Sequence, residues 1–408
     1  MTTGKKPLIV RFLKGVLVTM LVVIILLAAS VALLWFNRPV VIPPGIVNTL
    51  ADWDATLITY NGPGTLIVYM DATDPLLPRG DGVVVKDPIG SDILGEKRPL
   101  LVYLPPGYGE TADPYPLFLV LHGFGGRGQS MADIYLPIVE EAVSGGILEP
   151  SVLVFVDFSI SANGMNDPNT DIDERGGTWY VNSNLGRFED HFIDEIVPFA
   201  FETFNVRTDP DGVILTGKSM GGYGSVYYSI RYPWLSHIIV PFYPAADLRY
   251  GIDGDKLAPY DPLCFARIDT DDAKRIVNAM VMGDLLALSE EWLYYPVFNS
   301  DSSPGPVWYE DLPVWERYRK VSPVEMLEND IPDLNGHRYW LTVGGDDDFN
   351  FDEHVKILVP LLEKSGAVVH PEDPIIPGGR HSVTLIDEYL PEILVWVNEE
   401  MQSPYRRP

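Results

Sequence analysis

The chain has 408 residues, with 29 Lys and Arg against 57 Asp and Glu, so its formal net charge is −28. This acidity argues against nucleic acid as a partner, because phosphate binding needs a dense Lys/Arg surface. The single cysteine excludes a disulfide framework and a cysteine-based zinc site.

Residues 15–36 form an uncharged, strongly apolar segment, GVLVTMLVVIILLAASVALLWF. As a helix it would span roughly 33 Å, enough to cross a bilayer core of about 30 Å. Basic residues precede it, and Trp35 and Phe36 stand where an interfacial anchor is expected. The positive-inside rule then predicts a single-pass protein of the cell membrane. Residues 1–14 would be cytoplasmic, and the chain beyond the helix would be extracytoplasmic.

A cleaved signal peptide is the alternative interpretation of this segment. Ala28-Ala29-Ser30 resembles a small-residue cleavage site, and cleavage would release a secreted protein. The apolar region is longer than the roughly 7–15 residues usual in signal peptides, which favours the anchor.

Residues 37–82 are predicted to form a linker followed by a β-hairpin. The linker contains the stretch PVVIPPG, and residues 56–60 and 65–70 are apolar runs of β-type residues. The intervening Asn-Gly-Pro-Gly at 61–64 is typical of a hairpin turn.

From residue 83 to the C-terminus, short apolar runs alternate with helical patterns, which indicates one catalytic domain. Val/Ile/Leu-rich runs occur at 100–104, 117–121, 152–156, 213–215, 238–240 and 339–343. Such runs are typical of parallel strands that are covered on both faces. Apolar residues recur at four-residue spacing through residues 188–204, as on one face of a helix. The alternation predicts an α/β fold with a mostly parallel, doubly wound sheet.

Residues 245–335 interrupt this alternation. They form a stretch of about 90 residues rich in Pro, Asp and Trp, far longer than a connection between neighbouring elements needs. We therefore predict an inserted cap over one edge of the sheet.

The segment ILTGKSMGG at residues 214–222 places a Gly-x-Ser-x-Gly pattern directly after a predicted strand and before a predicted helix. This is the context of the nucleophile elbow in the α/β-hydrolase fold. The flanking glycines allow close approach of neighbouring backbones, and the helix N-terminus favours the negative charge that develops during attack. Ser219 is the predicted nucleophile.

Ser-His-acid chemistry also needs an oxyanion hole, one donor being the N–H of the residue after the nucleophile, here Met220. The second should come from the glycine-rich turn HGFGG that follows residues 117–121. Phe124 and Gly123 are both candidates for this donor. His122 is expected to order the turn and to take no part in proton transfer.

The general base follows Ser219 and the acid in the chain order of this fold. Four histidines remain: His337, His354, His370 and His381. Only His381 stands in a loop, GGRHS, directly before the last helical pattern. His381 is therefore the predicted base.

The acid is expected in the turn after residues 339–343, where GGDDDF offers Asp346, Asp347 and Asp348. Only one carboxylate should reach the imidazole and hold its tautomer. Asp347 is the preferred residue, and Asp348 is the next choice.

Residues 177–248, together with LLVYLPPGY, LHGFGG, GGDDDF and GGRHS, resemble the Putative esterase family. That family includes S-formylglutathione hydrolases, feruloyl esterases, enterochelin esterases and antigen 85 mycolyltransferases. The resemblance covers residues 83–244 and 336–398, and it aligns Asp347 with the family's acid and His381 with its base. The insert and the N-terminal anchor depart from the family pattern, which leaves the acyl and alcohol groups open.

These observations predict a membrane-anchored, extracytoplasmic serine esterase acting on a small-molecule or cell-envelope ester. No cofactor and no metal are expected. Trp179, Tyr180 and Tyr223 are candidates for lining the substrate cleft, with core packing as the alternative for each. Two other functions stay open: acyl transfer to a sugar or lipid alcohol, and non-catalytic binding on a hydrolase scaffold.

Overall fold

The computed structural model describes residues 57, 59–74, 77–159, 177–183, 186–247, 320–330, 332–347 and 351–402. The predicted membrane anchor, most of the predicted cap and Asp348 lie outside these residues. Within the described ranges, no helix is both long and apolar enough to cross a membrane.

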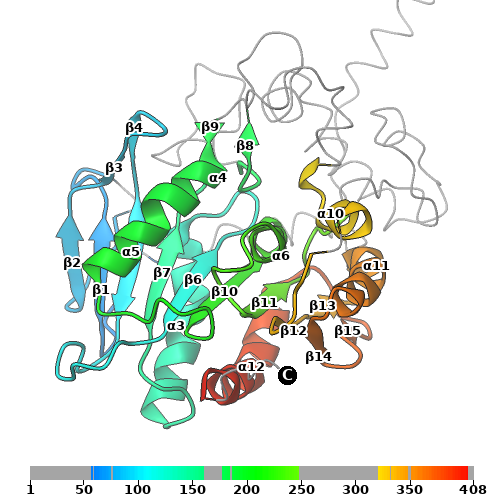
Figure 1. Cartoon of the computed structure of the whole chain (residues 1–408). Coiled ribbons are helices and arrows are strands. Elements are labelled where there is room, and N and C mark those ends of the chain that lie inside the picture. The colour runs from blue at the N-terminus through cyan, green and yellow to red at the C-terminus, as the bar shows by residue number, and fades with distance from the viewer. Residues whose placement is uncertain are drawn as a thin grey trace, which may run out of the picture. The chain divides into compact units, whose positions relative to one another are not determined.

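A nine-stranded sheet runs through the described part of the chain (Figure 1). In spatial order its strands are β14 (Val368–His370), β12 (Arg338–Trp340), β11 (Ile238–Phe242), β10 (Val213–Lys218), β6 (Leu117–Leu121), β7 (Val152–Val156), β5 (Leu100–Leu104), β1 (Thr65–Tyr69) and β2 (Val83–Lys86). The six strands from β14 to β7 are parallel, and β5 is antiparallel to both β7 and β1. The predicted mostly parallel α/β sheet is confirmed.

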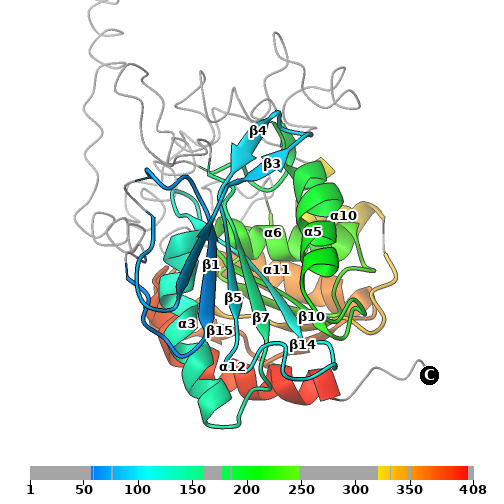
Figure 2. The same ribbon diagram turned by 90° about the vertical axis from the view of Figure 1, so that its left-hand side faces the viewer.

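Helices cover both faces of this sheet (Figure 2). One face carries α3 (Gly128–Ser144) and α12 (Thr384–Gln402), which contact each other. The other carries α4 (Phe188–Asp190), η1 (His191–Ile196), α5 (Val197–Thr203), α6 (Met220–Arg231), α10 (Pro323–Asn329) and α11 (Phe351–Lys364). Every residue of β6, β7 and β11 is buried, which explains why these strands are continuously apolar.

The helical stripe over residues 188–204 is interrupted by the π-helical segment η1. Phe188, Phe192, Ile196 and Ala200 are all buried, as the four-residue spacing predicts. In a regular α-helix such a repeat would drift by roughly 40° at each step, because four residues exceed one 3.6-residue turn. The wider i→i+5 winding of a π-helix reduces that drift and keeps the stripe facing the sheet.

The predicted hairpin around residues 61–64 is wrong. Residues 65–69 form β1, which pairs antiparallel with β5 and parallel with β2, while Thr59 bridges Arg79. Leu66 and Val68 are fully buried, and an isolated two-stranded hairpin could not bury them. The sheet therefore begins before residue 83, inside the segment assigned to the linker and hairpin.

The predicted strand at 339–343 is divided. β12 ends at Trp340, and β13 (Val343–Gly344) leaves the main sheet to pair with β15 (Ile375–Ile376). Gly345 N–H donates to the carbonyl of Ile376 at 2.7 Å, and Asp346 N–H donates to that of Gly379 at 2.8 Å. Because β13 pairs with β15, backbone hydrogen bonds connect the turn at 344–347 to the loop that leads into α12.

Part of the predicted insert belongs to the helical layer. Helix α10 lies against α6 and α11, with Val324 and Leu327 buried between them. Residues 248–319, the bulk of the predicted cap, lie outside the described residues. Short strand pairs complete the fold: β3 (Ile89–Ser91) with β4 (Glu96–Arg98), and β8 (Asn182–Ser183) with β9 (Gly186–Arg187).

Candidate active site

The candidate site lies where the chain changes direction across the sheet. Strands β6 and β10 are parallel neighbours, but the helix after β6, α3, covers one face and the helix after β10, α6, covers the other. The carboxyl ends of such a strand pair diverge into a crevice that α/β folds use for ligands. A pocket there is lined by Gly123, Phe124, Gly126, Lys218, Ser219, Tyr243, His381 and Val383.

Ser219 joins β10 to α6 in a strained conformation, with φ 55° and ψ −116°. A non-glycine residue rarely adopts a positive φ, so the surrounding structure must hold it there. Its N–H donates to the carbonyl of Phe242 at 3.0 Å, and its carbonyl accepts from the N–H of Tyr223 at 2.8 Å. These bonds present the side chain at the tip of a sharp turn, as the elbow pattern predicts.

The glycines of the elbow are required by close backbone contacts. A Cβ on Gly217 would stand 2.6 Å from the carbonyl oxygen of Leu121 in β6. A Cβ on Gly221 would overlap the same oxygen. Both positions therefore accept only glycine, and this brings α6 and β6 close together beside Ser219.

His381 meets Asp347 in the pocket wall. His381 Nδ1 lies 2.8 Å from Asp347 Oδ2, and both side chains are buried. The imidazole packs between the rings of Tyr243 and Phe351, with centroid distances of 4.3 and 5.3 Å. Because a carboxylate accepts hydrogen bonds, Nδ1 carries the proton, and Nε2 is the basic nitrogen of the neutral ring.

The structure distinguishes two of the three candidate carboxylates. Asp347 is fully buried, and its Oδ1 also accepts the N–H of Phe351 at 3.3 Å. The side chain of Asp346 is exposed, and its backbone N–H donates to the carbonyl of Gly379. Asp348 lies outside the described residues. Asp347 is the carboxylate that reaches His381.

The turn after β6 is organised by His122, which is fully buried. His122 Nδ1 lies 2.7 Å from the carbonyl oxygen of Gly123, and its Nε2 accepts the N–H of Phe158 at 2.8 Å. Burial lowers the pKa of His122 to about 4, so the ring is neutral near pH 7. This agrees with the expectation that His122 orders the turn. Met220, the other predicted source of an oxyanion donor, is the first residue of α6 beside Ser219.

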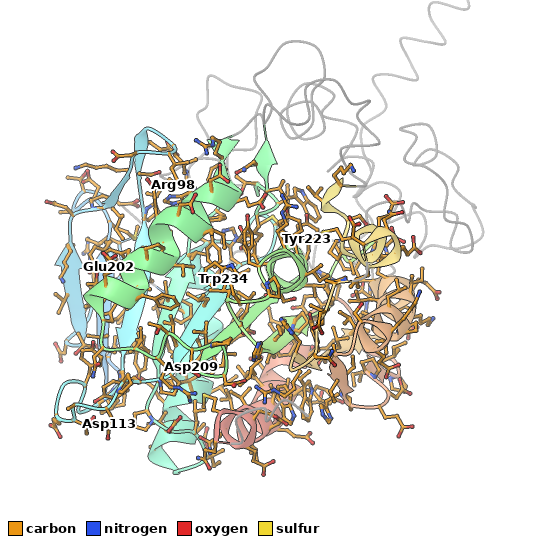
Figure 3. The ribbon with its side chains drawn as sticks, in the orientation of Figure 1. Arg98, Asp113, Glu202, Asp209, Tyr223 and Trp234 are labelled. Carbon is orange, nitrogen blue, oxygen red and sulfur yellow. The ribbon has the colours of Figure 1, made fainter. Side chains whose placement is uncertain are left out.

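The three aromatic residues expected at the substrate cleft belong to the hydrophobic core. Trp179, Tyr180 and Tyr223 are all buried, and none of them is among the described residues that line the pocket. The Tyr180 hydroxyl donates to the carbonyl of His122 at 2.7 Å. The hydroxyl of Tyr223, on α6 in Figure 3, donates to the carbonyl of Val321 at 2.8 Å. Core packing, the alternative interpretation, describes all three.

A family model described as Putative esterase matches residues 91–384. The chain belongs to this family. It is thus an esterase, an enzyme that hydrolyses carboxylic esters.

Solved structures of similar fold agree with the predicted α/β-hydrolase architecture. A ferulic acid esterase has a TM-score of 0.52 at 15% identity and covers 83% of this chain and 100% of its own. The fluorophosphonate-binding serine hydrolase FphF of Staphylococcus aureus has a TM-score of 0.51 at 13% identity, and the match covers 82% of this chain and 99% of its own. An S-formylglutathione hydrolase from Agrobacterium tumefaciens has a TM-score of 0.51 at 14% identity, and the match covers 77% of this chain and 94% of its own. At these identities the likeness establishes the fold.

An ion-pair network behind the pocket of the esterase was missed by sequence reasoning. Arg127 Nε lies 2.7 Å from Asp157 Oδ2, and Arg98 donates to the carbonyl of Ser159 at 2.6 Å and to that of Asp157 at 3.2 Å. Burial raises the pKa of Asp157, but the charges of Arg127, His122 and Arg98 and the hydrogen bond from Ser159 outweigh it and hold that pKa at about 2. The network fastens the residue after the HGFGG turn to the end of β7.

Sequence reasoning also missed Lys218, Tyr243 and Val383 in the pocket lining. A signal existed for two of them, since Lys218 immediately precedes Ser219 and Tyr243 immediately follows β11. Side chains at the carboxyl ends of adjacent parallel strands share one edge of the sheet. Val383 follows His381 in the same loop, and no comparable local pattern distinguishes it.

Proposed function

We propose that this esterase works through a Ser219–His381–Asp347 triad and a covalent acyl-enzyme. The observation that carries the proposal is the 2.8 Å contact between His381 Nδ1 and Asp347 Oδ2, beside a pocket that contains Ser219 at a φ of 55°. His381 contacts Asp347, and Ser219 lines the same pocket as His381. This supports the triad because the pocket lies at the edge of the sheet where this fold places its chemistry.

The chemistry follows from these positions. Nε2 of His381 accepts the hydroxyl proton as Ser219 Oγ attacks the ester carbonyl carbon. Backbone N–H groups of Met220 and of the HGFGG turn stabilise the oxyanion of the tetrahedral intermediate. Asp347 holds the Nδ1–H tautomer and stabilises the imidazolium. His381 then protonates the leaving alcohol, and a water molecule activated by the same nitrogen releases the acid.

Replacement of Ser219 tests the triad directly. In the full-length protein, Ser219→Ala should lower kcat for a p-nitrophenyl ester by about four orders of magnitude or more and abolish labelling by a fluorophosphonate. The control is Ser225→Ala in α6, the helix that follows Ser219. Among the described contacts, the buried Ser225 hydroxyl donates only to the carbonyl of Gly221, so this variant should retain labelling. Turnover that survives in Ser219→Ala would exclude Ser219 as the nucleophile.

We also propose that residues 15–36 anchor the enzyme, with the catalytic domain outside the cytoplasm. The support is the length of the apolar segment, the basic residues before it and the aromatic residues at its end. The substrate would then be a small ester or an envelope ester that reaches the outer face of the membrane. An intact N-terminal tag in the membrane fraction is the expected result, and a shortened soluble product would contradict the anchor.

A further inference from the structure

The imidazole of His122 is held from both nitrogens in a fully buried position. Nδ1 lies 2.7 Å from the carbonyl oxygen of Gly123, and Nε2 lies 2.8 Å from the backbone nitrogen of Phe158. A carbonyl oxygen can only accept and a backbone N–H can only donate, so Nδ1 must carry the proton and Nε2 must not. The contacts therefore select one neutral tautomer. The low pKa of about 4 that burial imposes keeps the ring in that form near pH 7.

The carbonyl of Gly123 is fixed from two directions. Besides His122 Nδ1, it accepts the N–H of Gly126 at 3.0 Å. That second bond closes a four-residue turn whose third residue, Gly125, has a φ of 70°, the conformation that a type II turn requires. The oxygen thus points towards the buried imidazole and the inside of the turn.

A trans peptide group is planar, so its C=O and N–H point in opposite directions. The carbonyl of Gly123 and the N–H of Phe124 belong to one such group. With the oxygen directed at the imidazole, the N–H is directed away from it. Gly123 and Phe124 both line the pocket that contains Ser219.

We propose that His122 is a positioning residue for ester hydrolysis: its Nδ1–H holds the Gly123 carbonyl inward, which aims the Phe124 N–H at the substrate oxyanion. This inference rests on the proposed function, because the donor acts only if Ser219 attacks beside it. It also distinguishes the two candidates in the turn and assigns the second oxyanion donor to Phe124 and not to Gly123.

The preceding peptide group is held in a similar way. The hydroxyl of Tyr180 donates to the carbonyl of His122 at 2.7 Å, and the rings of Tyr180 and His122 lie side by side with centroids 5.9 Å apart. Two successive carbonyls of the turn are therefore held by buried side chains. Such fixed dipoles stabilise an oxyanion well because no reorientation is needed when the charge develops.

Two substitutions of different length separate the two hydrogen bonds of His122. The amide of His122→Asn reaches the place of Nδ1 and can donate to Gly123, whereas that of His122→Gln reaches the place of Nε2 and can accept from Phe158. His122→Gln should lower kcat by about 10²-fold with little change in KM, as expected when an oxyanion donor is misdirected. His122→Asn should keep most of the wild-type kcat.

A transition-state analogue provides a readout that general loosening of the fold would not produce. The Ki of a trifluoromethyl ketone, which forms an anionic adduct with the serine, should rise in His122→Gln by the same factor by which kcat/KM falls. The affinity for the carboxylate product should not change. The proposal would be overturned by a folded His122→Gln variant with wild-type kcat. It would also be overturned by equal decreases in the affinity for the analogue and in that for the product.

A structure of the wild-type protein labelled with a fluorophosphonate tests the same point without any substitution. The phosphoryl oxygen should accept the Phe124 N–H while the Gly123 carbonyl stays on His122 Nδ1. If the oxygen instead contacts the Gly123 N–H, the positioning role of His122 is wrong although the triad stands. If Ser219 is not labelled, the proposed function itself fails.

Discussion

Asp347 and Asp346 are adjacent carboxylates in very different surroundings. Asp347 is fully buried and accepts from the imidazole of His381 and from the N–H of Phe351. Asp346 is exposed, and its N–H donates to the carbonyl of Gly379. Successive side chains of a turn point in different directions, so neighbouring residues of one type can have unrelated roles.

This difference predicts unequal effects of two matched substitutions. Asp347→Asn should lower kcat by roughly 10⁴-fold, because an amide can donate to the imidazole and favour the wrong tautomer. Asp346→Asn should leave kcat close to that of the wild type. Both are measured with a p-nitrophenyl ester at pH 7. Similar losses in the two variants, or a larger loss in Asp346→Asn, would contradict the assignment of Asp347.

At the scale of elements, a buried ion-pair network joins three parts of the fold behind the pocket. Arg98 ends β4, Asp157 follows β7, and Arg127 precedes α3, and all three side chains are almost fully buried. The Ser159 hydroxyl also donates to Asp157 Oδ1 at 2.5 Å. The network has a second carboxylate, Glu96, which lies 2.9 Å from Arg98 but is exposed. A buried charge is tolerated only when it is paired, so the two arginines depend mainly on the buried carboxylate of Asp157.

Asp157→Asn should therefore destabilise the protein more than loss of an exposed pair. Removing one partner of a buried pair lowers the free energy of unfolding by about 3–5 kcal/mol. The control is Asp209→Asn, whose half-exposed carboxylate pairs with Arg207 at 2.7 Å. Asp209→Asn should lower the free energy of unfolding by no more than about 1 kcal/mol. Figure 3 shows Asp209 well away from Arg98. Urea unfolding measures the stability of both variants, and equal decreases in their free energy of unfolding would contradict the stabilising role of the network.

At the scale of the whole molecule, burial of neutral histidines links stability to pH. Burial lowers the pKa of His122 and of His337 to about 4 each, against an ordinary value of 6.5. The unfolded chain therefore binds more protons than the folded protein between about pH 6.5 and pH 4. The stabilising contribution of both groups is complete above pH 6.5 and is lost as the pH falls through that window.

The free energy of unfolding should decrease by up to about 1.4 kcal/mol per pH unit for each of these histidines as the pH falls from 6.5 towards 4. His337→Gln removes one of them at a position that is not among the residues lining the pocket. Its pH slope should be smaller than that of the wild type, although its stability at pH 7 is also changed. Urea unfolding between pH 5 and pH 7 measures the slope, and an unchanged slope would contradict the linkage.

Local sequence was sufficient for much of the fold and for the centre of the candidate site. Apolar runs such as residues 117–121 and 152–156 predicted buried parallel strands, and the glycines around Ser219 predicted the elbow. These signals reflect short-range physics, because burial of both faces and close backbone approach restrict residue type at each position. The loop position of His381 and the expectation that His122 orders the turn also followed from neighbouring residues.

Tertiary structure decided the features that depend on distant partners. The β-type run at 65–69 is a strand in either interpretation, and only its pairing with β5 and β2 placed it in the main sheet. The sequence offered three adjacent carboxylates, and the pairing of β13 with β15 brought Asp347 to His381. Trp179, Tyr180 and Tyr223 proved to be core residues, since an aromatic side chain suits a cleft and a core equally. Sequence alone thus determined the candidate residue types and their order along the chain, and long-range packing determined which carboxylate contacts His381.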